Sequence, residues 1–271
     1  MYSTFGLHKN TKRTAKIVGT HQRIDRAART ALGRSLKNNA AFPSAKEILY
    51  FEGMRGPDGL KRKSPGIDEP HHFYIPGQDN SEFLTMLSDH QYNLRTALTE
   101  KDTVRASFEA AWLAHAVADG LTPAHHFPLH DVAEEMMTDQ EFYKIFGEPI
   151  KGIMRGNTKL ETLKKNWDYW GVDGHMSRHI AFEFGVAAVA ASATLREITP
   201  KFKKNELKNI DLIAEFEAAA SEIVSLDLYT RFADYGWAPS LANDIKNKLL
   251  LGATRLIALA WASAIPDGDK R

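Results

Sequence analysis

The sequence predicts an all-α fold that forms a single multi-helix domain over residues 1–271. Most segments place apolar residues three or four positions apart, which is the spacing that puts them on one face of a helix. No run of alternating β-branched residues indicates a strand. Apolar residues make up 43% of the 271-residue chain, and a domain of this length buries enough of them to form one sizeable core.

The apolar spacing predicts eight helices. In the first, Ile17, Ile24 and Leu32 share one stripe. Four prolines and five glycines between residues 53 and 80 interrupt any helical period, so this stretch is predicted to be a long loop, either ordered or disordered. Pro123 ends the third predicted helix. In chain order, the expected helices cover residues 14–36, 82–98, 103–119, 132–137, 158–169, 175–197, 209–226 and 241–264.

Charge and cysteine content exclude several classes of function. The chain carries 35 basic and 34 acidic side chains, so its net charge of +1 does not indicate a surface for duplex nucleic acid. It contains no cysteine, which excludes disulfides, thiolate zinc sites and a cysteine nucleophile. Any metal must therefore be held by imidazole and carboxylate groups, a ligand set that suits catalytic zinc better than structural zinc.

The sequence shows no export or membrane signal. Its N-terminal stretch has basic residues but lacks the apolar core of a signal peptide, so a cytoplasmic location is expected. The apolar stretch 185–195 is too short to span a bilayer, and the stretch 249–265 is interrupted by Arg255. We expect both stretches to be buried helices and the chain to have no transmembrane segment.

The strongest local pattern is formed by His115, Asp119 and His125. The first two are four positions apart and therefore project from the same face of a helix. Pro123 forces the chain out of that helix, which would let His125 fold back toward the same point. The surrounding residues are apolar, so the helix is expected to be buried, and a buried carboxylate with two imidazoles needs partners. Metal ions would meet that need.

Three weaker signals accompany this pattern. His179 and Glu183 repeat the four-residue spacing of an imidazole and a carboxylate. Asp58 and His72 lie in the proline-rich loop, and His21 lies on the apolar stripe of the first helix. Each signal alone has a simpler explanation, either a hydrogen-bonded surface pair or a core histidine with an ordinary partner. Together they favour a buried multinuclear metal site.

These residues resemble the zinc-dependent phospholipase C and fungal single-strand-specific nuclease superfamily. Its H-x3-D-x5-H pattern, with a proline two positions before the last histidine, is present in this chain. The chain also contains the superfamily's other motifs in the order expected along the sequence. They are an early histidine, an aspartate and a histidine in a loop, and a later H-x3-[DE] pattern. The matching residues are His21, Asp58, His72, His115, Asp119, Pro123, His125, His179 and Glu183. The long interval before His179 indicates an insertion.

The resemblance implies a helical phospholipase C/P1 nuclease-like domain with two to three Zn²⁺ ions. The ligand groups it implies are Asp58, His72, His115 and Asp119 for one ion, His125, His179 and Glu183 for the second, and His21 with a bridging Asp119 for the third. In the family, an N-terminal tryptophan completes the third site, whereas this chain has Met1 and its first tryptophan is Trp112. Family members are usually secreted, in contrast to the location expected from this N-terminus.

The implied activity is hydrolysis of a phosphodiester, with phospholipid head-group cleavage of the phospholipase C type as the first expectation. Glu183 is the choice typical of the phospholipases, and the alternative is a single-strand nuclease of the same superfamily. Asp58 would orient or deprotonate the attacking water. Lys61 and Phe73 are the candidate substrate contacts, for which a solvated basic loop and a core aromatic are the simpler interpretations.

Two further interpretations lie outside this superfamily. His130 and Asp131 form an adjacent pair similar to that of the HD-type metal phosphohydrolases, but that interpretation leaves the His115–His125 pattern unexplained. A non-catalytic helical domain stabilised by metal would use a closed site with four ligands, whereas eight candidate ligands indicate several ions with open positions. The number of bound ions separates the structural from the catalytic interpretation.

Overall fold

Helices account for almost all regular structure in the computed structural model, which describes residues 19–38, 42–52, 55–57, 74–127, 157–203, 205–266 and 270. Within these residues, β pairing is limited to one antiparallel bridge between Leu36 and Lys270. The all-α prediction is therefore confirmed for the described chain. The buried apolar side chains of the helices form one continuous core, as expected of a single domain.

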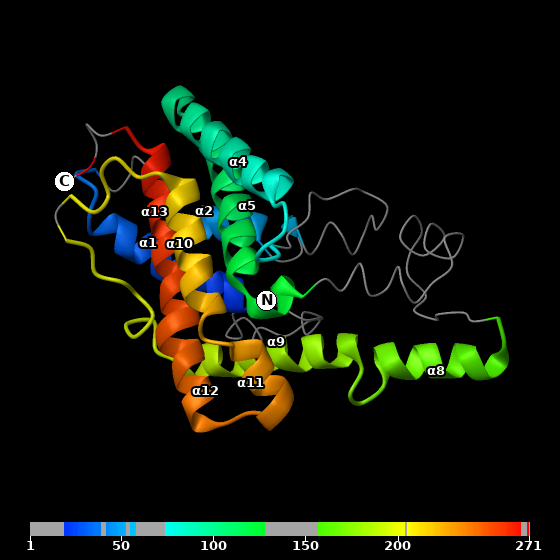
Figure 1. The fold of residues 1–271 in the computed structure, drawn as a ribbon. Helices are drawn as coiled ribbons and strands as arrows, with labels where there is room; N and C mark the ends of the chain where they lie inside the picture. Colours follow the sequence, from blue (N-terminus) through cyan, green and yellow to red (C-terminus); the bar gives the residue numbers. More distant parts are fainter. Residues whose placement is uncertain are drawn as a thin grey trace, which may run out of the picture.

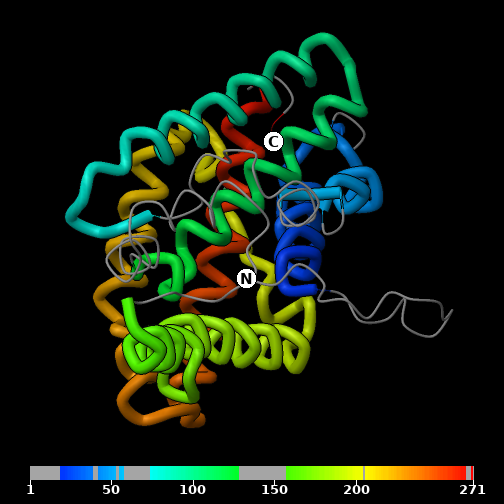
Figure 2. The backbone as a smooth tube through the Cα atoms, turned by 90° about the vertical axis from the view of Figure 1, so that its right-hand side faces the viewer, coloured from blue at the N-terminus to red at the C-terminus, as the bar shows by residue number. Residues whose placement is uncertain are grey.

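Helix α5 (Thr103–Leu121) lies at the centre of this core. It packs against α1 (Thr20–Gly33), α4 (Ser81–Glu100), α10 (Leu212–Val224) and α13 (Leu251–Ala264). Helices α5, α10 and α13 run side by side, and α4 crosses one end of the group (Figures 1 and 2). Nearly every residue of α5 beyond its first turn is consequently buried.

Small side chains explain how α5 can be surrounded by other helices. Its buried alanines are Ala106, Ala110, Ala111, Ala114, Ala116 and Ala118. The distance between packed helices depends on the side chains at the contact, so alanine allows close approach on several faces. Asp102 caps the helix by accepting a hydrogen bond from the Arg105 amide at 2.9 Å, and the helix ends just before Pro123, as predicted.

The remaining helices complete the fold around this centre. Before the proline-rich loop lie α2 (Ala45–Ile48) and the short 3₁₀ helix η3 (Leu49–Phe51), and directly after α5 comes η5 (Pro123–His126). Further along the chain are α8 (Lys159–Trp170), α9 (His175–Ser192), α11 (Leu228–Tyr235) and α12 (Pro239–Asp244). Among the helices that the structure describes, none has the length and apolar character needed to cross a bilayer.

Most predicted helices are confirmed, with differences at their ends. Helix α9 stops at Ser192, short of the predicted 197, because the Thr194 amide donates to Glu197 Oε2 at 2.7 Å and residues 194–197 form a separate turn. The predicted helix 241–264 contains a π-helical segment, Ile245–Leu250, between α12 and α13. Helices α2 and α11 were missed because they are too short to show a period. The helix predicted over 132–137 lies outside the described residues.

Candidate metal centre

The first cluster joins three segments that are distant in the sequence. His21 lies in the first turn of α1, Glu52 follows η3, and His115 lies in α5. His115 Nδ1 lies 3.1 Å from Glu52 Oε1, and the imidazole rings of His21 and His115 stack with centroids 4.1 Å apart. All three side chains are buried, and one possible ligand atom from each lies within 4.8 Å of the others. The cluster could therefore hold a metal ion.

The second cluster joins η5 to α9. His125 Nε2 lies 2.9 Å from Glu183 Oε1, and His179 Nε2 lies 3.4 Å from the same oxygen. His179 Nδ1 donates to the carbonyl oxygen of Ala124 at 3.2 Å. Because a carbonyl only accepts, the proton resides on Nδ1, and the Nε2 lone pair is directed at the cluster. This group also satisfies the distance requirement for holding an ion.

Asp119 lies between the two clusters and contacts both. Its Oδ1 is 3.1 Å from His21 Nε2, and its Oδ2 is 3.2 Å from His115 Nε2. Oδ2 also lies 3.9 Å from His125 Nδ1 in the second cluster. The shared helix face predicted for His115 and Asp119 is confirmed, and so is the return of His125 toward them after Pro123. One carboxylate thus links the two groups.

Electrostatics keep the two central carboxyl groups ionised. Burial by itself would raise the pKa of Asp119, but the positive charge around it, including that of the neighbouring imidazoles, holds the pKa well below its usual value. Burial opposes ionisation of Glu183 in the same way, but nearby positive charge and a hydrogen bond from His125 hold the pKa of that carboxyl well below normal. Both groups are therefore available as anionic ligands.

Asp25 adds a further buried carboxyl group beside the first cluster. It lies one helical turn after His21 on α1, and its Oδ2 has no hydrogen-bond partner among the described residues. Burial raises the pKa of Asp25 well above its usual value, the charge of Glu52 raises it further, and His115 lowers it. A bound cation would relieve this concentration of carboxyl groups, so the surroundings of the first cluster favour positive charge.

Replacing Asp25 with asparagine is expected to change how the stability of the metal-free protein depends on pH. The folded-state pKa of Asp25 lies above its unfolded value of about 3.9, so between the two the native state holds a proton that the unfolded state has lost. Wild-type stability therefore falls as pH rises through this window. Asp25→Asn removes this loss, so its free energy of unfolding relative to that of the wild type should rise by up to about 1.4 kcal/mol for each pH unit within the window. Urea unfolding with chelator present, at a series of pH values from about 4 upward, measures this; a difference independent of pH would contradict it.

The structure brings together six of the eight predicted ligands. They are His21, His115, Asp119, His125, His179 and Glu183. The predicted ligands Asp58 and His72, and the predicted substrate contacts Lys61 and Phe73, lie outside the described residues.

Sequence reasoning missed Glu52 and Asp25. Glu52 matches no motif, and only its position as an acidic residue after the run Ile48–Phe51 distinguishes it. Asp25 did carry a signal, since His21 and Asp25 have the same four-residue spacing that identified the other two pairs.

Other histidines near the centre have separate partners. His126 Nε2 donates to the Gly120 carbonyl oxygen at 2.9 Å. The ring of His175, which the sequence allowed as an alternative to His179, stacks on Phe127 with centroids 5.3 Å apart. His90 Nδ1 lies 2.6 Å from Glu109 Oε2, on the α4–α5 contact. These contacts account for the three side chains without a metal.

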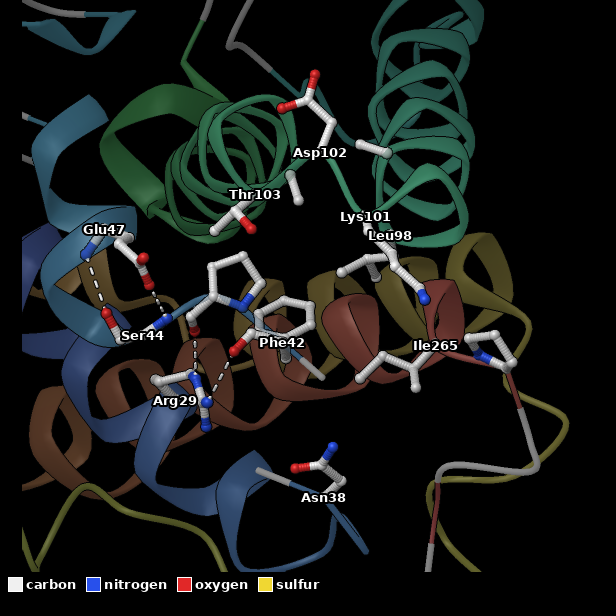
Figure 3. A pocket seen from close by; sticks show the side chains of 14 residues that line it. Arg29, Asn38, Phe42, Ser44, Glu47, Leu98, Lys101, Asp102, Thr103 and Ile265 are labelled. Atoms are coloured by element: carbon white, nitrogen blue, oxygen red, sulfur yellow. Dashed lines mark hydrogen bonds between the residues drawn. The ribbon is translucent and has the colours of Figure 1, made fainter. Parts of the chain in front are cut away.

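A pocket of about 880 Å³ lies near the end of α1 and the start of α5 (Figure 3). These are the ends of the two helices that lie farther from the two histidine–carboxylate clusters. Arg29 crosses the pocket wall and donates from Nε to the Pro43 carbonyl at 2.6 Å and from Nη2 to the Phe42 carbonyl at 3.1 Å. Glu47 accepts from the Ser44 amide at 2.7 Å. Arg29 is eight residues after His21, or roughly 12 Å along the helix axis. The pocket is therefore separate from the two clusters, and these charged groups stabilise its wall.

Comparison with known proteins supplies no relative for this chain. No protein-family model matches it, and neither a curated protein nor a solved structure does. The feature that bears on function is the site itself: two buried groups of histidine and glutamate, linked by Asp119, within an all-helical domain.

Proposed function

We propose that this chain is a zinc-dependent phosphodiester hydrolase of the phospholipase C type. The observation that carries the proposal is the placement of two buried imidazole–carboxylate clusters on either side of one shared carboxylate, Asp119. Adjacent metal sites of this kind are typical of enzymes that hydrolyse phosphate esters, in which two ions stabilise the attacking and the leaving oxygen. The resemblance to the zinc-dependent phospholipase C and nuclease superfamily supports the same reaction class.

Zinc is the metal that this ligand set favours. The described ligands are imidazoles and carboxylates, and the chain has no thiolate to offer. Sites rich in histidine suit zinc and other late transition metals, whereas Mg²⁺ and Ca²⁺ prefer oxygen ligands. His21, Glu52 and His115 would hold one ion, and His125, His179 and Glu183 another. The resemblance divides the first group differently: it gives His115 to one ion together with Asp58, His72 and Asp119, and gives His21 to a third ion.

Bound zinc would supply a water with a pKa of about 7 and positive charge for the phosphoryl oxygens. The protein's own groups hold the ligands in place: Ala124 fixes the tautomer of His179, and Glu52 and Asp119 flank the two nitrogens of His115. The resemblance gives Asp58 the role of orienting or deprotonating the attacking water, and gives Lys61 and Phe73 the contacts to substrate.

A metal count combined with a substrate panel tests the proposal. Protein stripped with chelator and reloaded with zinc is expected to bind two or three ions per chain and to hydrolyse bis-p-nitrophenyl phosphate and phosphatidylcholine only when reloaded. Preferential hydrolysis of single-stranded DNA or RNA would assign the nuclease activity instead. Full activity in the stripped protein would overturn the proposal. One tightly held ion with no hydrolysis would indicate a metal-stabilised, non-catalytic domain.

A further inference from the structure

Helix α8 exposes a stripe of large apolar side chains. Leu160, Leu163, Trp167 and Trp170 occupy positions spaced by three or four residues, and their exposed fractions are 77%, 66%, 65% and 40%. The next exposed apolar residue, Val172, is 83% exposed. Isolated apolar residues are common on protein surfaces, but four on one helix face, including two tryptophans, form a patch that is typical of an interaction site.

The stripe is not needed to fix α8 to the rest of the fold. On the other face of the helix, Tyr169 is only 5% exposed, and α8 packs against α9. Helix α8 continues the direction of α9 and projects beyond the other helices that the structure describes (Figure 1). The four apolar side chains therefore face away from the core that the structure describes.

Basic residues border the stripe, and acidic residues lie farther from it. At about 100° per residue, Lys159 and Lys164 lie roughly 60° and 80° from the centre of the stripe. By the same measure, rotation about the helix axis, Asp168 and Glu161 lie roughly 120° and 140° from the centre of the stripe. Both lysines are exposed, whereas Glu161 is partly buried and lies 3.7 Å from Lys165. The apolar face therefore has a positively charged border on both sides.

We propose that α8 is an interfacial anchor that binds an anionic phospholipid surface. A helix with tryptophan and leucine on one face and lysine at its border lies in the plane of the membrane interface, with the apolar side chains among the acyl chains and the lysines near the lipid phosphates. A protein partner of the stripe would not by itself require the lysine border, so the charge pattern favours lipid.

This inference rests on the proposed function and specifies its substrate as aggregated phospholipid rather than single-stranded nucleic acid. Helix α9 begins at His175, five residues after Trp170, and carries His179 and Glu183. An anchored α8 would therefore hold the second cluster close to the lipid surface. The anchor lies in the interval before His179 where the sequence indicated an insertion.

Vesicle binding by the full chain tests the anchor independently of catalysis. The wild-type protein, with or without zinc, should sediment with vesicles of phosphatidylcholine and phosphatidylserine more strongly than with phosphatidylcholine alone, and less strongly at high salt. The double variant Leu163→Ser/Trp167→Ser should bind at least about 10-fold more weakly. The variant Lys159→Gln/Lys164→Gln should bind roughly 30-fold more weakly and lose most of the preference for phosphatidylserine.

A matched control is provided by exposed apolar residues elsewhere. Tyr92 and Val104 are each 69% exposed on α4 and α5, so Tyr92→Ser/Val104→Ser should leave vesicle binding unchanged. Failure of the wild type to bind vesicles, or equal binding by the α8 variants, would overturn the anchor, as would a dimer that only the α8 variants abolish. Vesicle binding without hydrolysis of any phosphodiester would instead overturn the proposed function while the anchor stands.

Discussion

Asp119→Asn is expected to weaken metal binding at both clusters, whereas replacement of a ligand that belongs to one cluster should affect mainly that cluster. The reason is geometric: the two oxygens of Asp119 contact His21 and His115 on one side and His125 on the other. Loss of a residue that merely hydrogen-bonds to a metal ligand already reduces metal affinity or activity by about 10–100-fold. Because the proposed function makes Asp119 a ligand shared by both ions, we expect zinc affinity and bis-p-nitrophenyl phosphate hydrolysis each to fall by more than about 100-fold.

Zinc stoichiometry after dialysis at a buffered free-zinc concentration measures this effect, with circular dichroism to verify the fold. His179→Ala is the comparison for a single cluster, and it should spare the ion held by His21, Glu52 and His115. Asp234→Asn, at an exposed aspartate of α11, is the matched control and should bind zinc as wild type does. A folded Asp119→Asn variant with wild-type stoichiometry and affinity would show that Asp119 is not a shared ligand.

Trp261→Ala is expected to produce a large loss of stability, about 3–5 kcal/mol. Trp261 is fully buried in α13, and its Nε1 donates to the Ala110 carbonyl of α5 at 2.8 Å. Its ring also packs on Phe42, with centroids 5.6 Å apart. The alanine variant would leave a cavity between α5, α13 and the segment that contains Phe42. It would also remove the hydrogen bond that links α5 to α13.

Two variants separate the contributions at this position. Trp261→Phe keeps most of the buried apolar volume but loses the hydrogen bond, so its expected cost is about 1 kcal/mol plus a smaller cavity. Trp167→Ala, at a side chain that is 65% exposed, should change stability by less than about 0.5 kcal/mol. Urea unfolding with chelator present keeps bound metal from masking the differences. If Trp261→Ala proves as stable as Trp261→Phe, the surrounding helices must close the cavity left by the missing ring.

The sequence was sufficient for features that depend on local spacing. The period of apolar residues located α5 to within two residues at its C-terminus, and the four-residue spacing placed His115 beside Asp119 and His179 beside Glu183. Pro123 also predicted the return of His125, because proline reliably interrupts a helix. These relationships hold within one or two turns of the chain, so they require no knowledge of tertiary packing.

Features that depend on packing between distant segments were not predictable in the same way. Glu52 contacts His115 across 63 positions, and nothing in the residues around Glu52 indicates that contact. The exposed stripe of α8 follows the same apolar period as a buried helix face, so the sequence alone assigns it to the core. The exposed fractions of Leu163 and Trp167, together with the burial of Tyr169 on the opposite face, show that the stripe points away from the core.

The origin of the ligands from separate segments also has a mechanical consequence. An ion in the first cluster would connect α1, the segment after η3 and α5, and an ion in the second would connect η5 to α9 across the 58 positions between His125 and Glu183. In a chain without cysteine, such ions would serve as internal cross-links that close long loops, a role that disulfides fill in other proteins. The same atoms that hold the reactive metal would then also hold the domain together, so the metal supply would govern the lifetime of the folded chain.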